Sequence, residues 1–145
     1  MNVGTEMDAA AAGLPIRAWP AARSGLRREP AEGAKHPDEV LAKELERNEA
    51  TLAVLRGLRV PETARLPLAF VFETAGPEAD EALAAFLENE AGYDVTIEPG
   101  GVSGRTTPVE LSSEALEVWI RRMLHAGYWH GGCAFGGWTV AVSRT

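Results

Sequence analysis

The strongest constraint on the fold of this chain is an alternation of short period-two segments with helical segments after residue 65. In residues 66–74, LPLAFVFET, every second residue is large and apolar, which is typical of a strand with one buried face. A helix is expected to follow at residues 77–91, because Pro77 suits a first helical position and Gly92 suits the left-handed residue that ends a helix. The sequence therefore begins its folded part with a strand and a helix.

The same alternation continues to the C-terminus. A second strand is predicted at residues 93–98, followed by a flexible glycine-rich turn at residues 99–104. A third strand is predicted at residues 105–111. Ser112 or Ser113 can cap a third helix, and residues 133–143 give the last strand. The expected buried face of the third helix consists of Leu116, Trp119, Ile120, Met123 and Leu124.

This order predicts an α+β domain at residues 66–145, a ferredoxin-like βαββαβ sandwich with a four-stranded antiparallel sheet and two helices on one face. Pro108 conflicts with an internal third strand because proline lacks the N–H group that a ladder hydrogen bond needs. Either Pro108 lies at a bulge or the strand begins just after it.

Residues 1–60 divide into two parts. Residues 1–35 are expected to be a disordered tail, since they contain few large apolar residues and none in a regular period. Residues 36–60 contain an amphipathic helix, predicted at 37–58. Its expected apolar stripe consists of Val40, Leu41, Leu45, Leu52, Leu55 and Leu58. That stripe could cover the open face of the sheet, a second copy of the helix in a homodimer, or a partner protein.

The charge of the chain is concentrated in its second half. Residues 66–145 contain four Lys and Arg against eleven Asp and Glu, and the whole chain has a net charge of −7. Such a domain repels phosphate backbones, so direct binding of nucleic acid is disfavoured. A basic protein partner is physically reasonable, although the charge could also serve solubility alone. With a single cysteine and neither a signal peptide nor an apolar span in the sequence, we expect a cytoplasmic protein without membrane contact.

Few residues suggest catalysis. The sequence contains no phosphate-binding loop followed by a helix, and no nucleophile elbow. His125, His130 and Cys133 are the best metal candidates, since zinc can take three protein ligands, but no fourth ligand lies nearby in the sequence. Ordinary histidines beside a buried cysteine explain the same residues, and we assign no catalytic, cofactor or metal residue.

Two groups of residues are candidates for protein binding. Glu78, Glu81 and Glu88 would lie opposite the apolar face of the helix at 77–91 and form an acidic, solvated face. Tyr128 and Trp129 follow the apolar face of the third helix, in a segment rich in glycine and aromatic residues. Tyrosine and tryptophan are enriched at protein interfaces, but the same rings could simply close the end of the core.

The segment from Leu45 to Val142 resembles the RraB-like family, the protein inhibitors of ribonuclease E (regulator of ribonuclease E activity B). The resemblance rests on element order and on a few landmark residues: Phe72, Gly92, Tyr93, Gly132, Phe135, Gly137 and Trp138. Gly136 stands where the family usually has an acidic residue. The resemblance implies an acidic ferredoxin-like domain that binds ribonuclease E and modulates RNA turnover, without a cofactor or an active site. The alternatives from the residues alone are a homodimeric small-molecule-binding domain and a small metal-dependent enzyme.

Overall fold

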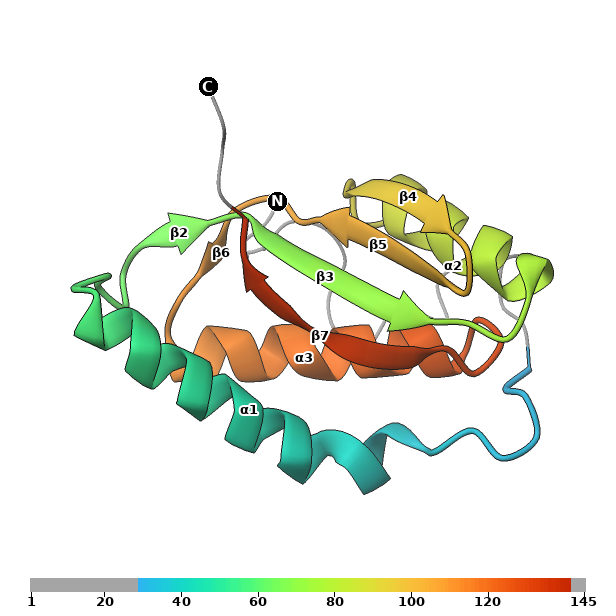
Figure 1. Ribbon diagram of the computed structural model, residues 1–145, viewed down its shortest axis with the longest axis horizontal. Coiled ribbons are helices and arrows are strands. Elements are labelled where there is room, and N and C mark those ends of the chain that lie inside the picture. The colour runs from blue at the N-terminus through green and yellow to red at the C-terminus, as the bar shows by residue number, and fades with distance from the viewer. Residues whose placement is uncertain (1–28, 142–145) are drawn as a thin grey trace, which may run out of the picture.

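The computed structural model describes residues 29–141 and shows an α+β fold (Figure 1). Of the expected tail at residues 1–35, residues 1–28 lie outside the described residues. The helices are α1 (Pro37–Gly57), α2 (Pro77–Asn89) and α3 (Ser113–Tyr128). The strands are β2 (Arg65–Leu66), β3 (Leu68–Glu73), β4 (Asp94–Glu98), β5 (Gly101–Arg105), β6 (Val109–Glu110) and β7 (Ala134–Val140). None of the helices in this described range is long and apolar enough to cross a membrane.

Four strands form the main sheet in the order β4-β5-β3-β7, and every neighbouring pair is antiparallel. The two short strands β2 and β6 pair separately, also antiparallel, beside the start of β3. The predicted α+β class and the four-stranded antiparallel sheet are therefore confirmed.

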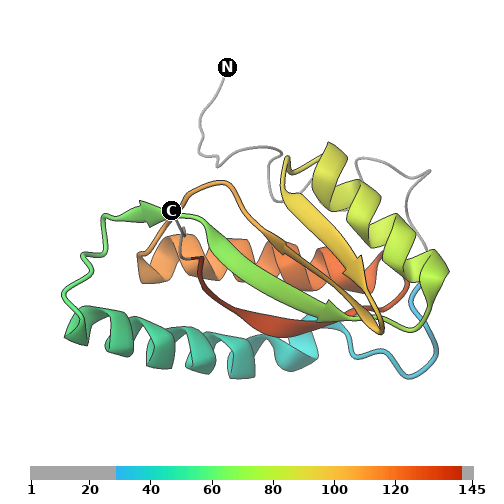
Figure 2. The same cartoon turned by 45° about the horizontal axis from the view of Figure 1, so that its top comes forward.

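The core lies between the sheet and helices α2 and α3, which share one side of it (Figure 2). On β3, Leu68, Phe70 and Phe72 are buried, whereas Val71 on the other face is 40% exposed. Phe72 packs edge-on against Phe135 of β7, with ring centroids 5.3 Å apart. The period-two pattern of this strand thus marks its buried face correctly.

Helix α3 begins as the sequence predicts. The Ser112 side-chain oxygen accepts a hydrogen bond from the backbone N–H of Ala115 at 3.1 Å, which satisfies a donor that the first helical turn leaves unpaired. All five residues of its expected apolar face are buried. Helix α2 has Pro77 at its first position, as expected, and ends at Asn89, two residues before the predicted boundary.

The third strand of the sheet was predicted in the wrong place. Residues 101–104, expected to belong to a flexible turn, form β5 (Gly101–Arg105) between β3 and β4 together with Arg105, whereas the strand was expected at 105–111. A Cβ atom on Gly101 would lie 2.4 Å from the carbonyl oxygen of Phe72, so the close approach of the two backbones requires glycine here. Pro108 lies just before β6, outside the main sheet, and so breaks none of its ladder hydrogen bonds.

Helix α1 was predicted at the right place, and most of its expected apolar stripe faces the core: Leu52 is buried, and Val40, Leu41 and Leu55 are half-buried against the core. It runs along α3 on the β7 side of the molecule (Figure 1), so it does not cover the open face of the sheet. Leu58 is 69% exposed. The buried residues of α1 are Pro37, Glu44, Asn48 and Leu52.

Candidate functional site

Helix α2 presents an acidic stripe to solvent. The side chains of Glu78, Glu81 and Glu88 are exposed and, at 100° per residue, fall within one quarter of the helix circumference. The opposite face buries Leu83 and Phe86. The sheet therefore anchors the helix by its apolar side and leaves the carboxylates of this stripe directed outward.

Asp80 belongs to the same helix but faces inward. Its residue is 9% exposed, and its carboxylate accepts a hydrogen bond from the hydroxyl of Thr74 in the loop before α2. Asp80 thus fixes the entry of the chain into α2, and the acidic residues of the helix divide into one structural residue and an outward stripe.

Tyr128 and Trp129 end helix α3, and both are half-buried. Their rings meet edge-on with centroids 4.9 Å apart. The Tyr128 ring also packs against His36, with centroids 5.1 Å apart. Tyr128 therefore contacts the residue just before α1, so part of its surface is used within the chain.

The turn after α3 reaches helix α2 through the residues that follow Trp129. The ring of His130 lies on that of Phe86, with centroids 4.6 Å apart, and Gly131 lies against Ala79. A Cβ on Gly131 would come within 2.7 Å of the Ala79 methyl group. The end of α3 and the start of α2 are therefore neighbours, joined by buried residues and not by the Glu81 and Glu88 side chains.

The three residues considered for metal binding have structural contacts instead. The described residues 29–141 contain no group of three or more His, Cys, Asp or Glu side chains that could hold a metal ion. His130 is fully buried, and its Nδ1 atom lies 2.6 Å from the carbonyl oxygen of Ala126. The ring of His125 packs edge-on against the ring of His36, with centroids 6.1 Å apart.

Cys133 is also a poor nucleophile in this environment. Its thiol is buried and donates to the carbonyl oxygen of His130 at 3.5 Å. Burial, together with the nearby Asp80 carboxylate, raises the pKa of the Cys133 thiol to about 12. Because the thiolate is the reactive species, this cysteine stays protonated and unreactive near neutral pH.

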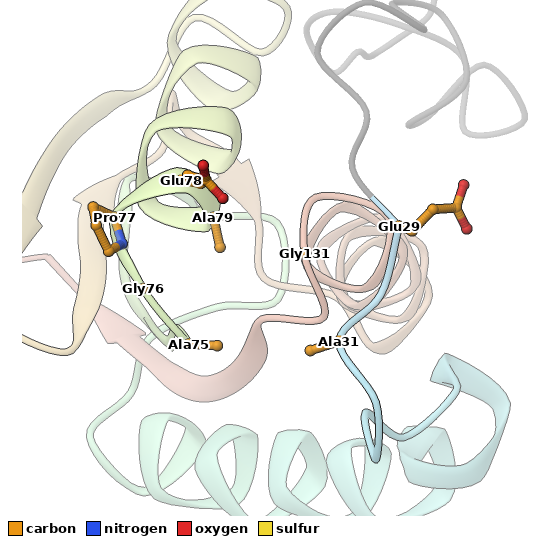
Figure 3. A pocket seen from close by; sticks show the side chains of 8 residues that line it. All are labelled: Glu29, Ala31, Ala75, Gly76, Pro77, Glu78, Ala79 and Gly131. Carbon is orange, nitrogen blue, oxygen red and sulfur yellow. The ribbon is translucent and has the colours of Figure 1, made fainter.

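A cavity of about 800 Å³ lies beside the start of α2, which is within the size range of ligand pockets (Figure 3). Ala31 and Ala75 point toward one another from its two sides, whereas the Glu29 carboxylate points away from it. Its remaining lining residues are Gly76, Pro77, Glu78, Ala79 and Gly131. These walls lack the converging polar groups that orient a small ligand.

The sequence pattern predicts the apolar residues that attach α1, but not the polar ones. His36 caps this helix, and Asn48 accepts a hydrogen bond from the indole N–H of Trp138 at 2.7 Å. The His36-Pro37-Asp38-Glu39 segment does contain a signal, because a glutamate three residues after the cap can complete a capping box. The Asn48–Trp138 pair is separated by 90 residues and leaves no local signal.

Searches against protein-family models, curated proteins and solved structures found no match for this chain.

Proposed function

We propose that this protein is a non-catalytic regulator that binds another protein, and that its partner is ribonuclease E or a related RNA-processing enzyme. The observation that carries the proposal is the outward acidic stripe of α2, Glu78, Glu81 and Glu88, in a domain that carries the whole net negative charge of the chain. Such a surface attracts a basic protein segment and repels nucleic acid.

The fold supports a ferredoxin-like assignment. In chain order, β3, β4, β5 and β7 correspond to the first, second, third and fourth strands of a βαββαβ chain. Across the sheet they are arranged as second, third, first and fourth. Both βαβ halves then place their helix against the same side of the sheet, as the RraB-like resemblance implies. Fold alone does not fix function, so the target rests on the resemblance and the charge together.

The landmark residues of the resemblance have structural explanations. Gly92 and Gly137 have φ angles of 75° and 119°, which favour glycine. Phe72 and Phe135 are buried against each other. These four residues shape turns or fill the core, so partner recognition falls to other positions, of which the α2 stripe is the best candidate.

The direct test is calorimetric titration of purified ribonuclease E with the full chain and with a variant carrying Glu81→Lys and Glu88→Lys. An exposed ion pair contributes up to about 1 kcal/mol, so reversing two charges is expected to weaken binding by roughly tenfold. Binding of the wild type should also weaken with added salt.

A matched control carries Glu46→Lys and Glu114→Lys, which reverse two exposed charges on α1 and α3 and change the net charge equally. Its affinity should stay near that of the wild type. Circular dichroism would establish that both variants are folded. Equal affinity of the α2 variant and the wild type, or equal loss in both variants, would refute the role of the stripe.

A further inference from the structure

The described part of the chain begins beside the acidic stripe of α2. Its first residue, Glu29, lines the same cavity as Glu78, the first residue of the stripe (Figure 3). The backbone N–H of Ala31 donates to the carbonyl oxygen of Gly131 at 3.3 Å, and a Cβ on Gly132 would lie 2.7 Å from the Ala31 nitrogen. These close contacts fix the entering segment in place. The 28 residues that precede Glu29 are therefore tethered next to the α2 stripe.

The segment before this tether has the charge that α2 lacks. Residues 9–28 contain no Asp or Glu and four basic residues, Arg17, Arg23, Arg27 and Arg28. Residues 29–145 contain ten Lys and Arg against nineteen Asp and Glu. A run of unopposed arginines thus comes immediately before the acidic part of the chain.

The outer part of the stripe has no cation beside it among residues 29–141. The ion pairs in this range involve other carboxylates. Helix α2 itself contains no Lys or Arg, and Glu81 and Glu88 are both exposed. A row of unopposed carboxylates on a rigid helix attracts a basic segment. The basic segment nearest to it along the chain is the one that ends at the tether.

The spacing of the arginines matches that of the stripe. Glu78 and Glu88 are ten residues apart on a helix, which corresponds to about 15 Å. Arg23 and Arg28 are five residues apart, which corresponds to about 17 Å in an extended chain. Since Arg28 directly precedes Glu29 at the cavity, Arg23 can reach Glu88 while Arg28 stays near Glu78.

We propose that residues 17–28 bind back onto the acidic stripe of α2 and cover it in the free protein. The tether makes this contact intramolecular, so the effective concentration of the arginines at the stripe is in the millimolar range. Exposed ion pairs, although weak, then suffice to compete with an incoming basic segment. A partner has to displace residues 17–28 before it binds. That the covered surface is also the partner's site rests on the function proposed above, whereas the binding of these residues to α2 does not.

The test attaches a nitroxide spin label to the full chain through Ala22→Cys, next to Arg23. The native Cys133 is buried and its thiol stays protonated near neutral pH, so the label reacts with the introduced cysteine. The NMR signals of the Glu81 and Glu88 amides should broaden relative to the same sample with a reduced label. High salt should restore them, because it screens exposed charges.

The charges of α2 decide whether this broadening reflects binding. In the labelled chain, Glu81→Lys with Glu88→Lys should remove most of the broadening at these two positions. The matched control, Glu46→Lys with Glu114→Lys, changes the net charge equally and should retain it. A segment that lies near α2 only because of its tether would broaden the signals equally in both variants. That result would overturn the proposal.

A second measurement leaves α2 unchanged and uses the peptide of residues 14–28 as a basic probe. In calorimetric titration, this peptide should bind the chain with Arg23→Ser, Arg27→Ser and Arg28→Ser more tightly than the wild type. The expected gain is up to about tenfold, because three exposed ion pairs no longer compete with the probe. Equal affinity for the two chains would show that the stripe is not covered, and would overturn the proposal.

A control chain removes three exposed cations that lie outside this segment, through Lys43→Ser, Arg65→Ser and Arg105→Ser. It has the same net charge as the variant that lacks the three arginines, and its affinity for the peptide should stay near that of the wild type. An equal gain in both chains would reduce the effect to net charge and would also overturn the proposal. Neither measurement contains ribonuclease E, so a ribonuclease E that does not bind would contradict the proposed function alone.

Discussion

Helices α1 and α2 are attached to the same domain by different means. Helix α2 buries seven residues, of which all but Asp80 are apolar. Helix α1 is longer, at 21 residues, yet its fully buried residues are Pro37, Glu44, Asn48 and Leu52, and its other apolar contacts, Val40, Leu41 and Leu55, are half-buried. The larger helix therefore has the smaller apolar contact.

This difference separates a helix held by fully buried apolar residues from one held by a mixed apolar and polar contact. Apolar burial is non-directional and strong, so α2 is fixed and can present its carboxylates from a rigid position. The contact of α1 with α3 and β7 (the α1 seam) is mixed: Leu52 is buried and Val40, Leu41 and Leu55 are half-buried, beside polar residues whose hydrogen bonds contribute about 1 kcal/mol each. We expect α2 to act as the binding surface and α1 to be the more easily detached of the two helices.

The largest expected effect contrasts one core residue with one seam residue. Phe72 has no exposed surface, so Phe72→Ala should reduce the free energy of unfolding of the whole domain by about 3–5 kcal/mol. Leu52→Ala should cost about 2 kcal/mol, with the loss appearing as detachment of α1. Denaturant unfolding and hydrogen exchange would distinguish the two. Equal losses of protection in β3 for both variants would remove the distinction between the core of the sheet and the α1 seam.

An intermediate effect concerns the hydrogen bond that joins α1 to β7. Asn48→Leu leaves the Trp138 indole N–H unpaired, and Trp138→Phe leaves the Asn48 amide unpaired, at about 1–3 kcal/mol each. The double variant leaves neither group unpaired and should cost less than the two single changes added together. Unfolding free energies of the four proteins form the test. Strict additivity would show that this bond does not hold the seam.

The smallest effect is a pH dependence within the seam. The pKa of Glu44 is raised chiefly by burial, and Arg47 and Lys43 oppose the rise. Its stability contribution is therefore present below pH 4.5 and lost as pH rises through the folded pKa. Relative to Glu44→Gln, the wild type should be most stable near pH 4 and less so at pH 7. Unfolding at a series of pH values would check this, and a constant difference would contradict the buried state of the carboxylate.

The predictability of each element depends on whether its local sequence carries an apolar pattern. Strands and helices with large apolar residues at a regular period, such as β3 and α3, were predicted to within a few residues. Strand β5 was missed because glycine is depleted in strands, whereas here Gly101 and Gly104 are required by neighbouring backbones. That requirement comes from the packed sheet and is invisible in the local sequence.

The candidate site was predictable where it depends on helix period and not where it depends on distant partners. The outward position of Glu81 and Glu88 follows from their spacing. The contact of Tyr128 with His36 brings together residues 92 positions apart, which no local pattern indicates. The choice of ribonuclease E as partner comes from the family resemblance, because no pattern of charge identifies a specific protein.

The most direct test of the proposed function is the rate at which purified ribonuclease E cleaves a single-stranded RNA in the presence of increasing amounts of the full chain. The proposal predicts a saturable fall in rate, which the Glu81→Lys and Glu88→Lys variant reproduces only at higher concentration. A cleavage rate unchanged by a large excess of the folded protein would contradict the proposed regulation of this enzyme.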